Sequence, residues 1–297
     1  MATFEELGFK EEILKAVADL GFEQAMPIQE KVTPFLFSDD DRDLVALAQT
    51  GTGKTGGFGL PVLQLIDVTQ KKIQALVLAP TRELCIQISK DLKNFSKYME
   101  GMKVVPVYGG ESIVRQFKDL DVQPQILVAT PGRLIDLIER GKVHLEEIKF
   151  LILDEADEML NMGFKEDIER ILSETPESRR TLLFSATMPK EIARIAKEYM
   201  KNSVEIAIGE KNSGNENVRH IYYMVAAKNR YACLKRVVDI NPDIYGIVFC
   251  RTRQETKDVA EALMKDGYNA DALHGDLSQV QRDAVMQKFR IRNLSSS

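Results

Sequence analysis

The chain has 297 residues, which suits about two domains, and its apolar fraction of 44% is enough to fill real cores. Its net charge of −5 excludes binding of nucleic acid through an overall positive field, so any such contact must come from a local patch. Three widely spaced cysteines argue against a disulfide framework or a zinc site, and without a signal-peptide core or a long apolar run we expect a cytoplasmic protein with no membrane contact. Apolar positions between residues 4 and 20 suit a helix that Gly21 ends, and Pro27 lies where a second helix could start.

The next segment predicts a phosphate-binding loop. An apolar run at 44–47 suits a buried strand, and a glycine-bearing loop at 48–55 follows it before a helix-like segment. Backbone N–H groups of such a loop, with the positive end of the helix, can cradle phosphate oxygens. Lys54 would reach the β- and γ-phosphates, and the Thr55 hydroxyl would hold Mg²⁺. The strict G-x-x-x-x-G-K-[ST] pattern is not met because Ala48 replaces its first glycine, and an ordinary turn with a surface lysine is the alternative.

Five further short apolar runs predict strands, and each one ends in a polar cluster. They lie at 73–78, 104–108, 126–129, 150–153 and 181–184. Continuously apolar strands are typical of a parallel sheet that is covered on both faces, and helical periods lie between most of these runs. The alternation predicts a doubly wound α/β domain, in which ligands bind beyond the carboxyl ends of the strands.

Two adjacent carboxylates, Asp154 and Glu155, come directly after the run at 150–153. An acidic residue in this place can hold Mg²⁺, commonly through water, and its neighbour can orient or deprotonate an attacking water. A solvated acidic turn is the alternative.

Seven motifs in this order resemble those of the DEAD-box ATP-dependent RNA helicases. They are 21–29, 48–55, 80–84, 109–110, 130–133, 154–157 (which reads D-E-A-D) and 185–187. The resemblance extends from Phe4 to about Arg290, nearly the whole chain. It implies a fold of two RecA-like doubly wound parallel-sheet domains in tandem. The implied organisation is an ATP-binding domain at 1–208, a linker at 209–217 and an incomplete second domain at 218–297.

The resemblance also implies roles for individual residues. Gln29 would read the adenine edge and so select ATP over GTP. The implied ATP-binding residues are Phe4, Gln24, Gln29, Thr50, Gly51, Thr52, Gly53, Lys54, Thr55 and Gly56. The implied catalytic residues are Lys54, Asp154 and Glu155, with Mg²⁺ held by Thr55 and, through water, by Asp154. The implied RNA-binding residues are Pro80, Thr81, Arg82, Gly109, Gly110, Thr130, Gly132 and Arg133. The residues implied to couple the ATP state to RNA are Asp157, Ser185 and Thr187.

The predicted RNA contacts are backbone N–H groups, hydroxyls and two arginines, which bind phosphates without reading bases. We therefore expect binding of single-stranded or short duplex RNA that tolerates many sequences and weakens with salt. Ordinary surface arginines are the alternative for Arg82 and Arg133.

Two departures from the family pattern carry expectations. Ala25-Met26 replaces the usual Pro-Thr, which should loosen the loop before Gln29. Gly56, Gly57 and Gly59 replace alanines, which should weaken the first helical turn by up to ~1 kcal/mol each.

Beyond the predicted linker, strands are expected at 221–225 and 246–250, and helices at 227–239, 252–266 and about 278–290. The family's A-T-D-x-x-A-R-G-x-D and H-R-x-G-R-x-G-R segments do not occur in the sequence, which favours a truncated chain. The second of these segments carries arginine fingers, a type of group worth ~10³–10⁵ in rate.

Two functions compete on this evidence, of which we expect the first, and a third is disfavoured. The first is an ATP-dependent RNA helicase that couples ATP binding and hydrolysis to RNA binding and local duplex unwinding. The second is a binding module that holds nucleotide and RNA with little or no turnover. The third is a DNA translocase, which the Gln29 motif and the literal D-E-A-D disfavour; competition between RNA and DNA of equal sequence would separate it from the first.

Overall fold

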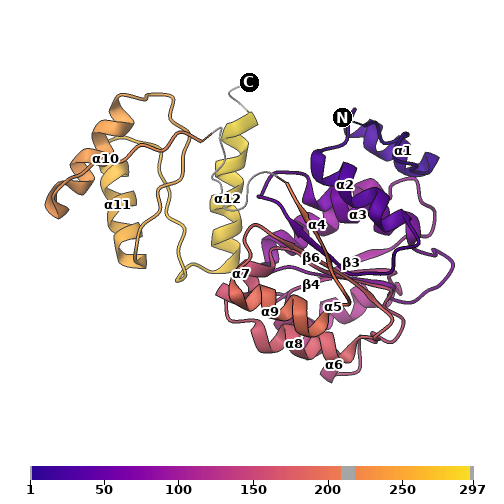
Figure 1. The fold of residues 1–297 in the computed structure, drawn as a ribbon. Helices are drawn as coiled ribbons and strands as arrows, with labels where there is room; N and C mark the ends of the chain where they lie inside the picture. The colour runs from indigo at the N-terminus through magenta and orange to yellow at the C-terminus, as the bar shows by residue number, and fades with distance from the viewer. Residues whose placement is uncertain (1, 209–217, 295–297) are drawn as a thin grey trace. The chain divides into compact units, whose positions relative to one another are not determined.

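The computed structural model describes residues 2–208 and 218–294 and divides the chain into two compact units, Met1–Val218 and Arg219–Ser297. Figure 1 shows their helices and strands. The predicted linker, 209–217, lies outside the described residues, and the predicted domain boundaries stay a prediction.

The first unit is built on one sheet of seven parallel strands in the order β3-β4-β2-β5-β6-β1-β7. The strands are β1 (Leu44–Leu47), β2 (Ala75–Leu78), β3 (Val104–Val107), β4 (Ile126–Ala129), β5 (Phe150–Leu153), β6 (Arg180–Ser185) and β7 (Val204–Ala207). Next to the edge strand β7, β1 pairs with both β6 and β7, and Leu44 lies opposite Leu182 on one side and Val204 on the other. Four strands are buried along their whole length, as expected for strands covered on both faces: β1, β2, β4 and β5.

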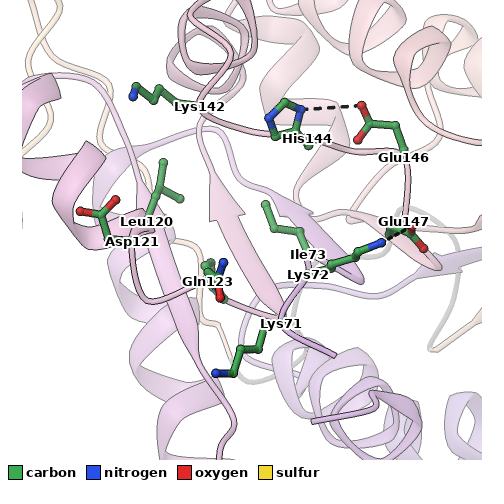
Figure 2. Close-up of a pocket in the computed structure, with 11 residues that line it drawn as sticks. Lys71, Lys72, Ile73, Leu120, Asp121, Gln123, Lys142, His144, Glu146 and Glu147 are labelled. Carbon is green, nitrogen blue, oxygen red and sulfur yellow. Dashed lines mark hydrogen bonds and ion pairs between the residues drawn. The ribbon is translucent and has the colours of Figure 1, made fainter. Parts of the chain in front are cut away.

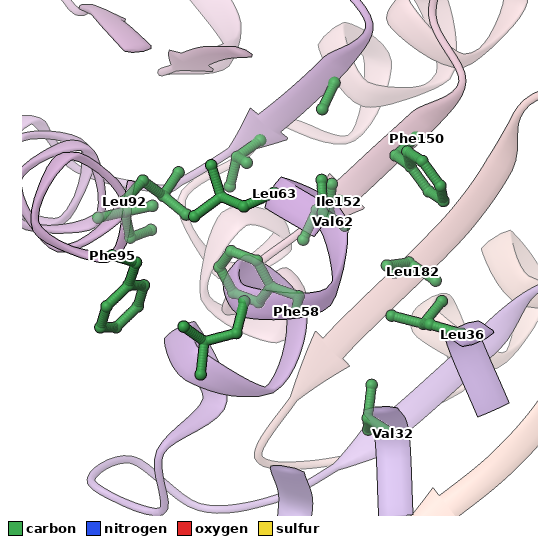
Figure 3. Close-up of a cluster of buried hydrophobic side chains, with 14 of the residues drawn as sticks. Val32, Leu36, Phe58, Val62, Leu63, Leu92, Phe95, Phe150, Ile152 and Leu182 are labelled. Atoms are coloured by element: carbon green, nitrogen blue, oxygen red, sulfur yellow. The ribbon is translucent and has the colours of Figure 1, made fainter. Parts of the chain in front are cut away.

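Nine helices in the described part of the first unit cover this sheet. They are α1 (Glu11–Asp19), α2 (Pro27–Phe37), α3 (Lys54–Leu65), α4 (Arg82–Phe95), α5 (Ile113–Leu120), α6 (Pro131–Glu139), α7 (Ala156–Asn161), α8 (Lys165–Glu174) and α9 (Lys190–Tyr199). Because side chains alternate along a strand, Leu44 and Ala46 join a core with α1 to α4, whereas Val45 and Leu47 join a core with α5 to α9. Figure 3 shows the first core, where Phe58 of α3 lies between the sheet and the neighbouring helices.

The structure confirms the predicted doubly wound α/β domain and its six predicted strands. The seventh strand, β7, was missed because Glu205 interrupts its four-residue V-E-I-A run at the sheet edge. The predicted first helix is shorter than expected: Gly8 has φ +83°, so regular helix begins only at Glu11. Gly21, with φ +72°, ends it as predicted.

The described part of the second unit consists of helices and irregular chain. The helices are η1 (Ala227–Asn229), α10 (Arg230–Asp239), α11 (Arg253–Lys265) and α12 (Gln279–Leu294), which confirms the three predicted helical segments. The predicted strands at 221–225 and 246–250 are wrong, because residues 219–294 contain no strand. Each run lacks a partner strand there, and an unpaired strand is not stable by itself. Tyr222 and Phe249 are accordingly 86% and 92% exposed.

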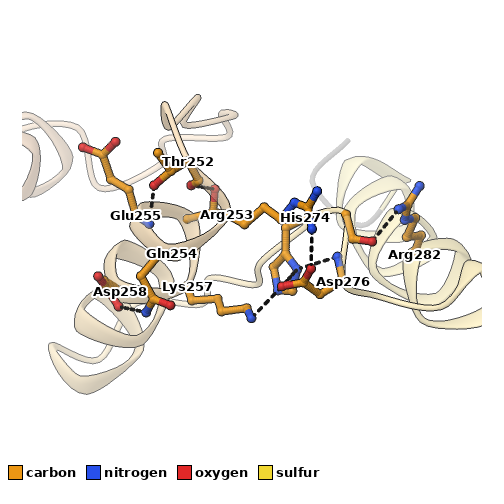
Figure 4. A network of polar contacts seen from close by, with 11 residues as sticks. Thr252, Arg253, Gln254, Glu255, Lys257, Asp258, His274, Asp276 and Arg282 are labelled. Carbon is orange, nitrogen blue, oxygen red and sulfur yellow. Dashed lines mark hydrogen bonds and ion pairs between the residues drawn. The ribbon is translucent and has the colours of Figure 1, made fainter.

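A polar network joins α11 to the segment before α12 (Figure 4). The carboxylate of Asp276 accepts hydrogen bonds from Lys257 at 2.9 Å and from Arg253 at 2.7 Å, and these two cations lower its pKa to about 2. Arg282 donates to the carbonyl of Gly275 at 3.2 Å. At the start of α11, the Thr252 hydroxyl accepts the Glu255 N–H at 3.1 Å and so caps the helix. These contacts fix the local shape of the second unit without a sheet.

Candidate functional site

The strand order separates the predicted nucleotide residues from the predicted RNA residues. The loops at 48–55, 154–157 and 185–187 follow β1, β5 and β6, which are neighbours in the order β5-β6-β1. The loops that carry the predicted RNA residues follow β2, β3 and β4, which are neighbours in the order β3-β4-β2. Because all strands are parallel, the six loops lie at one edge of the sheet, where ligands bind in such folds. β2 borders β5, so the two groups of loops meet in the middle of that edge.

The loop after β1 has the backbone that a phosphate cradle requires. Gly51 and Gly53 have φ of +79° and +82°, in the left-handed region that favours glycine. The Thr52 hydroxyl donates to the carbonyl of Gln49 at 2.7 Å, which closes the turn, and Thr50 lies exposed at its tip. Lys54 is the first residue of α3, so the positive end of the helix dipole faces the loop.

Lys54 is buried at the base of this loop and is only 7% exposed. Its Nζ has no hydrogen-bond partner among the described residues. A buried ammonium without a hydrogen-bond partner costs free energy, because it has lost its hydrogen bonds to water and gained none from the protein. Its position therefore suits an anionic ligand such as a phosphate, which would supply the missing acceptors.

Asp154 is the second buried charged group at this edge, 3% exposed at the end of β5. Burial raises the pKa of its carboxyl from 3.8 to about 6; the positive charge of Lys54 opposes this rise, and the negative charge of Glu155 adds to it. Its Oδ1 accepts the N–H of Glu155 at 3.0 Å. A carboxylate so placed beside a buried lysine suits a divalent cation bound together with phosphate.

The neighbouring Glu155 has a strained backbone. Its φ of +52° and ψ of +50° place it in the left-handed region, which is rare for residues other than glycine. It turns the chain directly from β5 into α7, so that Glu155 is half-buried while Asp154 is buried. Strain of this kind persists where the surrounding structure holds it, and it concentrates at functional sites.

Gln29 connects α2 to the phosphate loop. Its Oε1 accepts the N–H of Met26 at 2.9 Å, which caps α2, and its Nε2 donates to the carbonyl of Gly53 at 3.2 Å. The side chain is 4% exposed, so the predicted adenine reader is already held beside the loop. Ala25 in the preceding segment is fully buried, and its N–H donates to the Ala2 carbonyl at 2.9 Å; the expected loosening of this segment stays a prediction.

The other predicted nucleotide residues lie nearby with less definite roles. Phe4 is 4% exposed in the core, with its ring centroid 6.1 Å from that of Phe9, whereas Gln24 is exposed. Thr55 is half-buried in the first turn of α3. These roles stay predictions.

Residues at the ends of β5 and β6 are joined directly. The carboxylate Oδ2 of Asp157 accepts both the N–H of Thr187 at 3.0 Å and its hydroxyl at 2.7 Å. The Ser185 hydroxyl donates to the carbonyl of Thr187 at 2.7 Å. The three predicted coupling residues therefore form one hydrogen-bonded group.

The predicted RNA residues lie on the other half of the edge. Thr81 caps α4, since its hydroxyl accepts the N–H of Leu84 at 3.2 Å, and Thr130 occupies the N-cap position of α6. Pro80 is buried, whereas Gly109, Gly110 and Gly132 are exposed. The N-termini of two helices therefore begin within the predicted RNA surface, as suits phosphate groups.

Two residues that sequence reasoning missed hold the arginines of this surface. Gln116 of α5 is 1% exposed; its Oε1 accepts from Arg133 at 2.8 Å and its Nε2 donates to the Tyr108 carbonyl at 3.0 Å. Arg133 also donates to the carbonyl of Glu111 at 3.0 Å. The guanidinium of Arg82 lies over the ring of Tyr108, 5.1 Å from its centroid. The available sequence signal was a glutamine among the apolar positions Ile113, Phe117 and Leu120 of one helix face.

A cavity of about 650 Å³ lies at the opposite, amino-terminal edge of the sheet (Figure 2). Its lining comes from the segments that precede β2, β4 and β5 and includes Lys71, Lys72 and Lys142. Lys72 pairs with Glu147 at 2.6 Å, and His144 lies 3.7 Å from Glu146. None of the predicted site residues lines this cavity.

Within the described residues, no cluster of three or more His, Cys, Asp or Glu side chains could hold a metal ion alone. In the same part of the chain, no helix is both long and apolar enough to cross a membrane.

Comparison with known proteins decides the family. The family model described as DEAD/DEAH box helicase matches residues 26–195, more than half of the chain. The chain belongs to this helicase family. A second model, helicase conserved C-terminal domain, matches residues 229–296, which lie in the second unit.

Curated relatives and solved structures agree with this assignment. The DEAD-box ATP-dependent RNA helicase CshA of Geobacillus kaustophilus is 46% identical over 290 residues, which cover 98% of this chain and 62% of that protein. The ATP-dependent RNA helicase CshA of Listeria monocytogenes is 45% identical over 98% of this chain and 55% of its own length. This helicase-family chain thus spans about three fifths or less of the curated relatives that it matches.

Two solved structures cover almost the whole chain. A DEAD box protein from the hyperthermophile Methanococcus jannaschii is 41% identical, with a TM-score of 0.66, over 98% of this chain and 78% of that one. A point variant of S. cerevisiae Dbp5, bound to RNA and ADP BeF3, is 27% identical, with a TM-score of 0.88, over 99% of this chain and 74% of that one.

Proposed function

We propose that this chain is part of an ATP-dependent RNA helicase, which uses ATP binding and hydrolysis to grip RNA and separate short duplexes locally. The observation that carries the proposal is the buried Lys54 ammonium, without a hydrogen-bond partner among the described residues, at the same sheet edge as the buried carboxylate of Asp154. Relatives named as ATP-dependent RNA helicases, and the RNA-bound Dbp5 structure, support the substrate assignment.

The loop residues account for binding of the triphosphate. N–H groups of residues 50–56 and the dipole of α3 attract phosphate oxygens, and Lys54 supplies the positive charge for the β- and γ-phosphates. Thr55 and Asp154 would hold Mg²⁺, the latter through water, and the bound ion would offset charge on the phosphates. Two observations support binding of Mg²⁺ and triphosphate here. The buried Lys54 ammonium has no hydrogen-bond partner among the described residues, and the buried Asp154 carboxylate needs a cation beside it when it is ionised.

Glu155 is the residue proposed to activate water. In hydrolysis a water oxygen bonds to the γ-phosphorus, the bond from that phosphorus to the β,γ-bridging oxygen breaks, and ADP leaves with that oxygen. The attacking water loses its proton to the Glu155 carboxylate. The rigid turn at Glu155 fixes the direction of this carboxylate relative to Asp154, which is the kind of preorganisation that catalysis uses.

RNA is proposed to lie across the loops that follow β2, β3 and β4. The N-termini of α4 and α6, the exposed glycines and the guanidinium groups of Arg82 and Arg133 suit a phosphate backbone. None of these groups demands a particular base, so the binding is expected to tolerate many sequences and to weaken with salt. The hydrogen-bonded group of Asp157, Ser185 and Thr187 is proposed to link the nucleotide half of the edge to its RNA half.

A second candidate function is a module that binds nucleotide and RNA with little or no turnover. It needs only the phosphate loop and the predicted RNA surface, both of which lie in the first unit. Rapid turnover would in addition need positive charge opposite the transferred phosphoryl group, such as arginine fingers, a type of group worth ~10³–10⁵ in rate.

One experiment separates the two functions. ATP hydrolysis is measured with and without single-stranded RNA for the chain and for Glu155→Gln, beside nucleotide affinity for both. Turnover that RNA stimulates and the variant loses supports the helicase. Tight nucleotide binding without turnover supports the module. Unchanged nucleotide affinity in Lys54→Ala would contradict both, because each depends on the phosphate loop.

A further inference from the structure

Arg82 lies at a place that does not favour a cation by itself. It is the first residue of α4, and Thr81 caps the same end of this helix. The N-terminus of a helix carries a partial positive charge, which repels a guanidinium and attracts an anion such as a phosphate. The half-buried Arg82 side chain therefore needs support from its surroundings if its charge is to stay at this end of the helix.

The ring of Tyr108 lies against this guanidinium. The Cζ atom of Arg82 is 5.1 Å from the ring centroid, within the ~6 Å at which a cation is attracted to the face of an aromatic ring. Burial raises the pKa of the Tyr108 phenol and the positive charge of Arg82 opposes this rise, as expected for a cation close to the ring. The cation–π contact thus offsets the repulsion from the helix end.

The backbone and the ring of Tyr108 are themselves held in place. Its carbonyl accepts the Nε2 N–H of Gln116 at 3.0 Å, and Gln116 is only 1% exposed. The preceding residue, Val107, is fully buried at the end of β3, and its carbonyl accepts the N–H of Thr130 at 3.0 Å. The ring packs against the core that the sheet shares with α1 to α4. A ring held in this way can impose its orientation on the arginine over it.

The guanidinium that the ring holds lies among the other predicted RNA groups. Nη1 of Arg82 is 4.0 Å from the position that a Cβ on Gly110 would take, so it reaches the exposed turn after β3. The carbonyl of Tyr108 is also connected to Arg133, because Arg133 donates to Oε1 of Gln116 at 2.8 Å. Both predicted RNA arginines are thus supported from one residue, one by its ring and the other by its carbonyl through a glutamine.

We propose that Tyr108 is a positioning residue of the RNA surface, whose ring holds the Arg82 guanidinium at the start of α4 in the orientation that receives an RNA phosphate. The inference rests on the proposed function, in which Arg82 contacts RNA. An arginine side chain that is ordered before binding loses less conformational entropy when a phosphate arrives. The ring itself need not touch RNA, so Tyr108 adds to the affinity without adding a charge.

The structure offers conservative variants and a matched control. Tyr108→Phe keeps the aromatic face, whereas Tyr108→Leu and Tyr108→Met remove the face and keep an apolar side chain against the core. Tyr98 is the matched control, because the ammonium of Lys97 lies 5.0 Å from its ring centroid. This pair follows the C-terminal end of α4, whereas Arg82 begins the helix. Tyr98→Leu therefore removes a contact of the same kind away from the predicted RNA residues.

The test measures the affinity of the 297-residue chain for single-stranded RNA at several salt concentrations, beside nucleotide affinity and Tm. Tyr108→Leu is expected to weaken RNA binding about three- to tenfold, the usual effect of one partly desolvated cation–π contact. The slope of log affinity against log salt should stay unchanged, because no charge is lost. Tyr108→Met should behave like Tyr108→Leu, whereas Tyr108→Phe and Tyr98→Leu should keep the affinity. In an Arg82→Ala background, Tyr108→Leu is expected to have no further effect.

Several results would overturn the inference. Full RNA affinity in Tyr108→Leu and Tyr108→Met, while Arg82→Ala loses it, would do so and would leave the proposed function intact. An equal loss in Tyr108→Phe would assign the effect to the hydroxyl, and an equal loss from Tyr108→Leu in both Arg82 backgrounds would show that the ring acts without Arg82.

Two further outcomes also count against the positioning role. A parallel loss of nucleotide affinity or of Tm in both Tyr108→Leu and Tyr108→Met would show that the ring supports the whole unit and not one arginine. Unchanged RNA affinity in Arg82→Ala itself would remove Arg82 from the proposed RNA surface and the inference with it.

Discussion

The carboxylate of Asp157 accepts two hydrogen bonds from one residue, Thr187, through its backbone N–H at 3.0 Å and its hydroxyl at 2.7 Å. This contact joins the loop after β5 to the loop after β6, thirty residues apart in the sequence. It links the D-E-A-D segment directly to the S-A-T segment. Its position suits a relay between the nucleotide and the RNA rather than a contact to either ligand.

Thr187→Ala should weaken the coupling between the two ligands. The substitution removes the hydroxyl bond and leaves the backbone bond to Asp157 in place. We expect the factor by which an ATP analogue raises RNA affinity to fall about five- to tenfold, because a hydrogen bond to a carboxylate is stronger than a neutral one. Affinity for each ligand alone should change by less than about twofold.

Thr187→Ser is the control for this prediction, since it keeps the hydroxyl and should keep the coupling. The measurement is RNA affinity with and without nucleotide for both variants. A serine variant that behaves like the alanine variant would assign the effect to lost methyl packing and not to the bond with Asp157.

Asp154 should make the ligand-free protein less stable as the pH rises. Because burial raises its pKa from 3.8 to about 6, the folded state holds a proton in this range that the unfolded state has lost. The free energy of unfolding therefore falls as the pH rises from about 3.8 to about 6, and above about pH 6 the full loss of stability is present. At about 1.4 kcal/mol per pKa unit, Asp154→Asn should stabilise the chain by up to about 3 kcal/mol at pH 8. The gain should vanish below pH 3.8.

Protonation of Asp154 should weaken binding of Mg²⁺–ATP. The proposed Mg²⁺ site needs the ionised carboxylate, so affinity for Mg²⁺–ATP is expected to fall as the pH drops below about 6, and Asp154→Asn should abolish this pH dependence along with tight binding. Urea unfolding at pH 5 and pH 8, beside nucleotide titrations at both values, tests both statements. Equal stability of the variant and the original chain at pH 8 would show that the buried carboxylate carries no such cost.

The sequence alone predicted the sheet of the first unit because its strands are short, apolar and bounded by polar clusters. Leu44–Leu47 and Phe150–Leu153 agree with the predicted runs to the residue. β7 lacked this signal, since an alternating edge strand resembles a polar loop. The prediction of strands at 221–225 and 246–250 was wrong for another reason. Their composition favours strands, but a strand requires a partner, and composition does not show whether one is present.

The candidate site was predictable where chemistry depends on residue order, and not where it depends on side-chain packing. The loop at 48–55 and the pair Asp154-Glu155 follow from the pattern of strand, polar cluster and helix. The burial of Lys54 and the strain at Glu155 could not be predicted from this pattern, because both depend on the three-dimensional surroundings of the residue. The hydrogen bond from Gln29 to the carbonyl of Gly53 was equally invisible, since the two residues are distant in the sequence.

Gly59 should be required for the close approach of α3 and α4. A Cβ on Gly59 would lie 2.7 Å from Cδ2 of Leu92, which is 1% exposed and has no room to retreat. Gly59→Ala should therefore destabilise the chain by about 1–3 kcal/mol, more than the gain in helix propensity of up to about 1 kcal/mol. Gly57→Ala should only stabilise. Denaturant unfolding of both variants is the measurement, and equal gains in stability would contradict the predicted overpacking.

Gln116 should matter for RNA binding although no part of it is exposed enough to contact RNA. It bridges Arg133 and the Tyr108 carbonyl, so its loss frees the guanidinium to adopt other rotamers. We expect Gln116→Ala to weaken binding of single-stranded RNA about three- to tenfold, because the Arg133 side chain would then lose conformational entropy when RNA binds. Arg133→Ala should weaken it at least as much, and nucleotide affinity should stay unchanged in both.

Salt dependence separates positioning from charge in this last case. Arg133→Ala removes a phosphate contact, so the slope of log affinity against log salt should become shallower by about one contact. Gln116→Ala keeps the charge, so its slope should stay close to that of the original chain. Gln87→Ala, an exposed glutamine on α4, is the matched control and should change neither quantity. A slope that falls equally in Gln116→Ala and Arg133→Ala would show that Gln116 contributes to more than the orientation of one guanidinium.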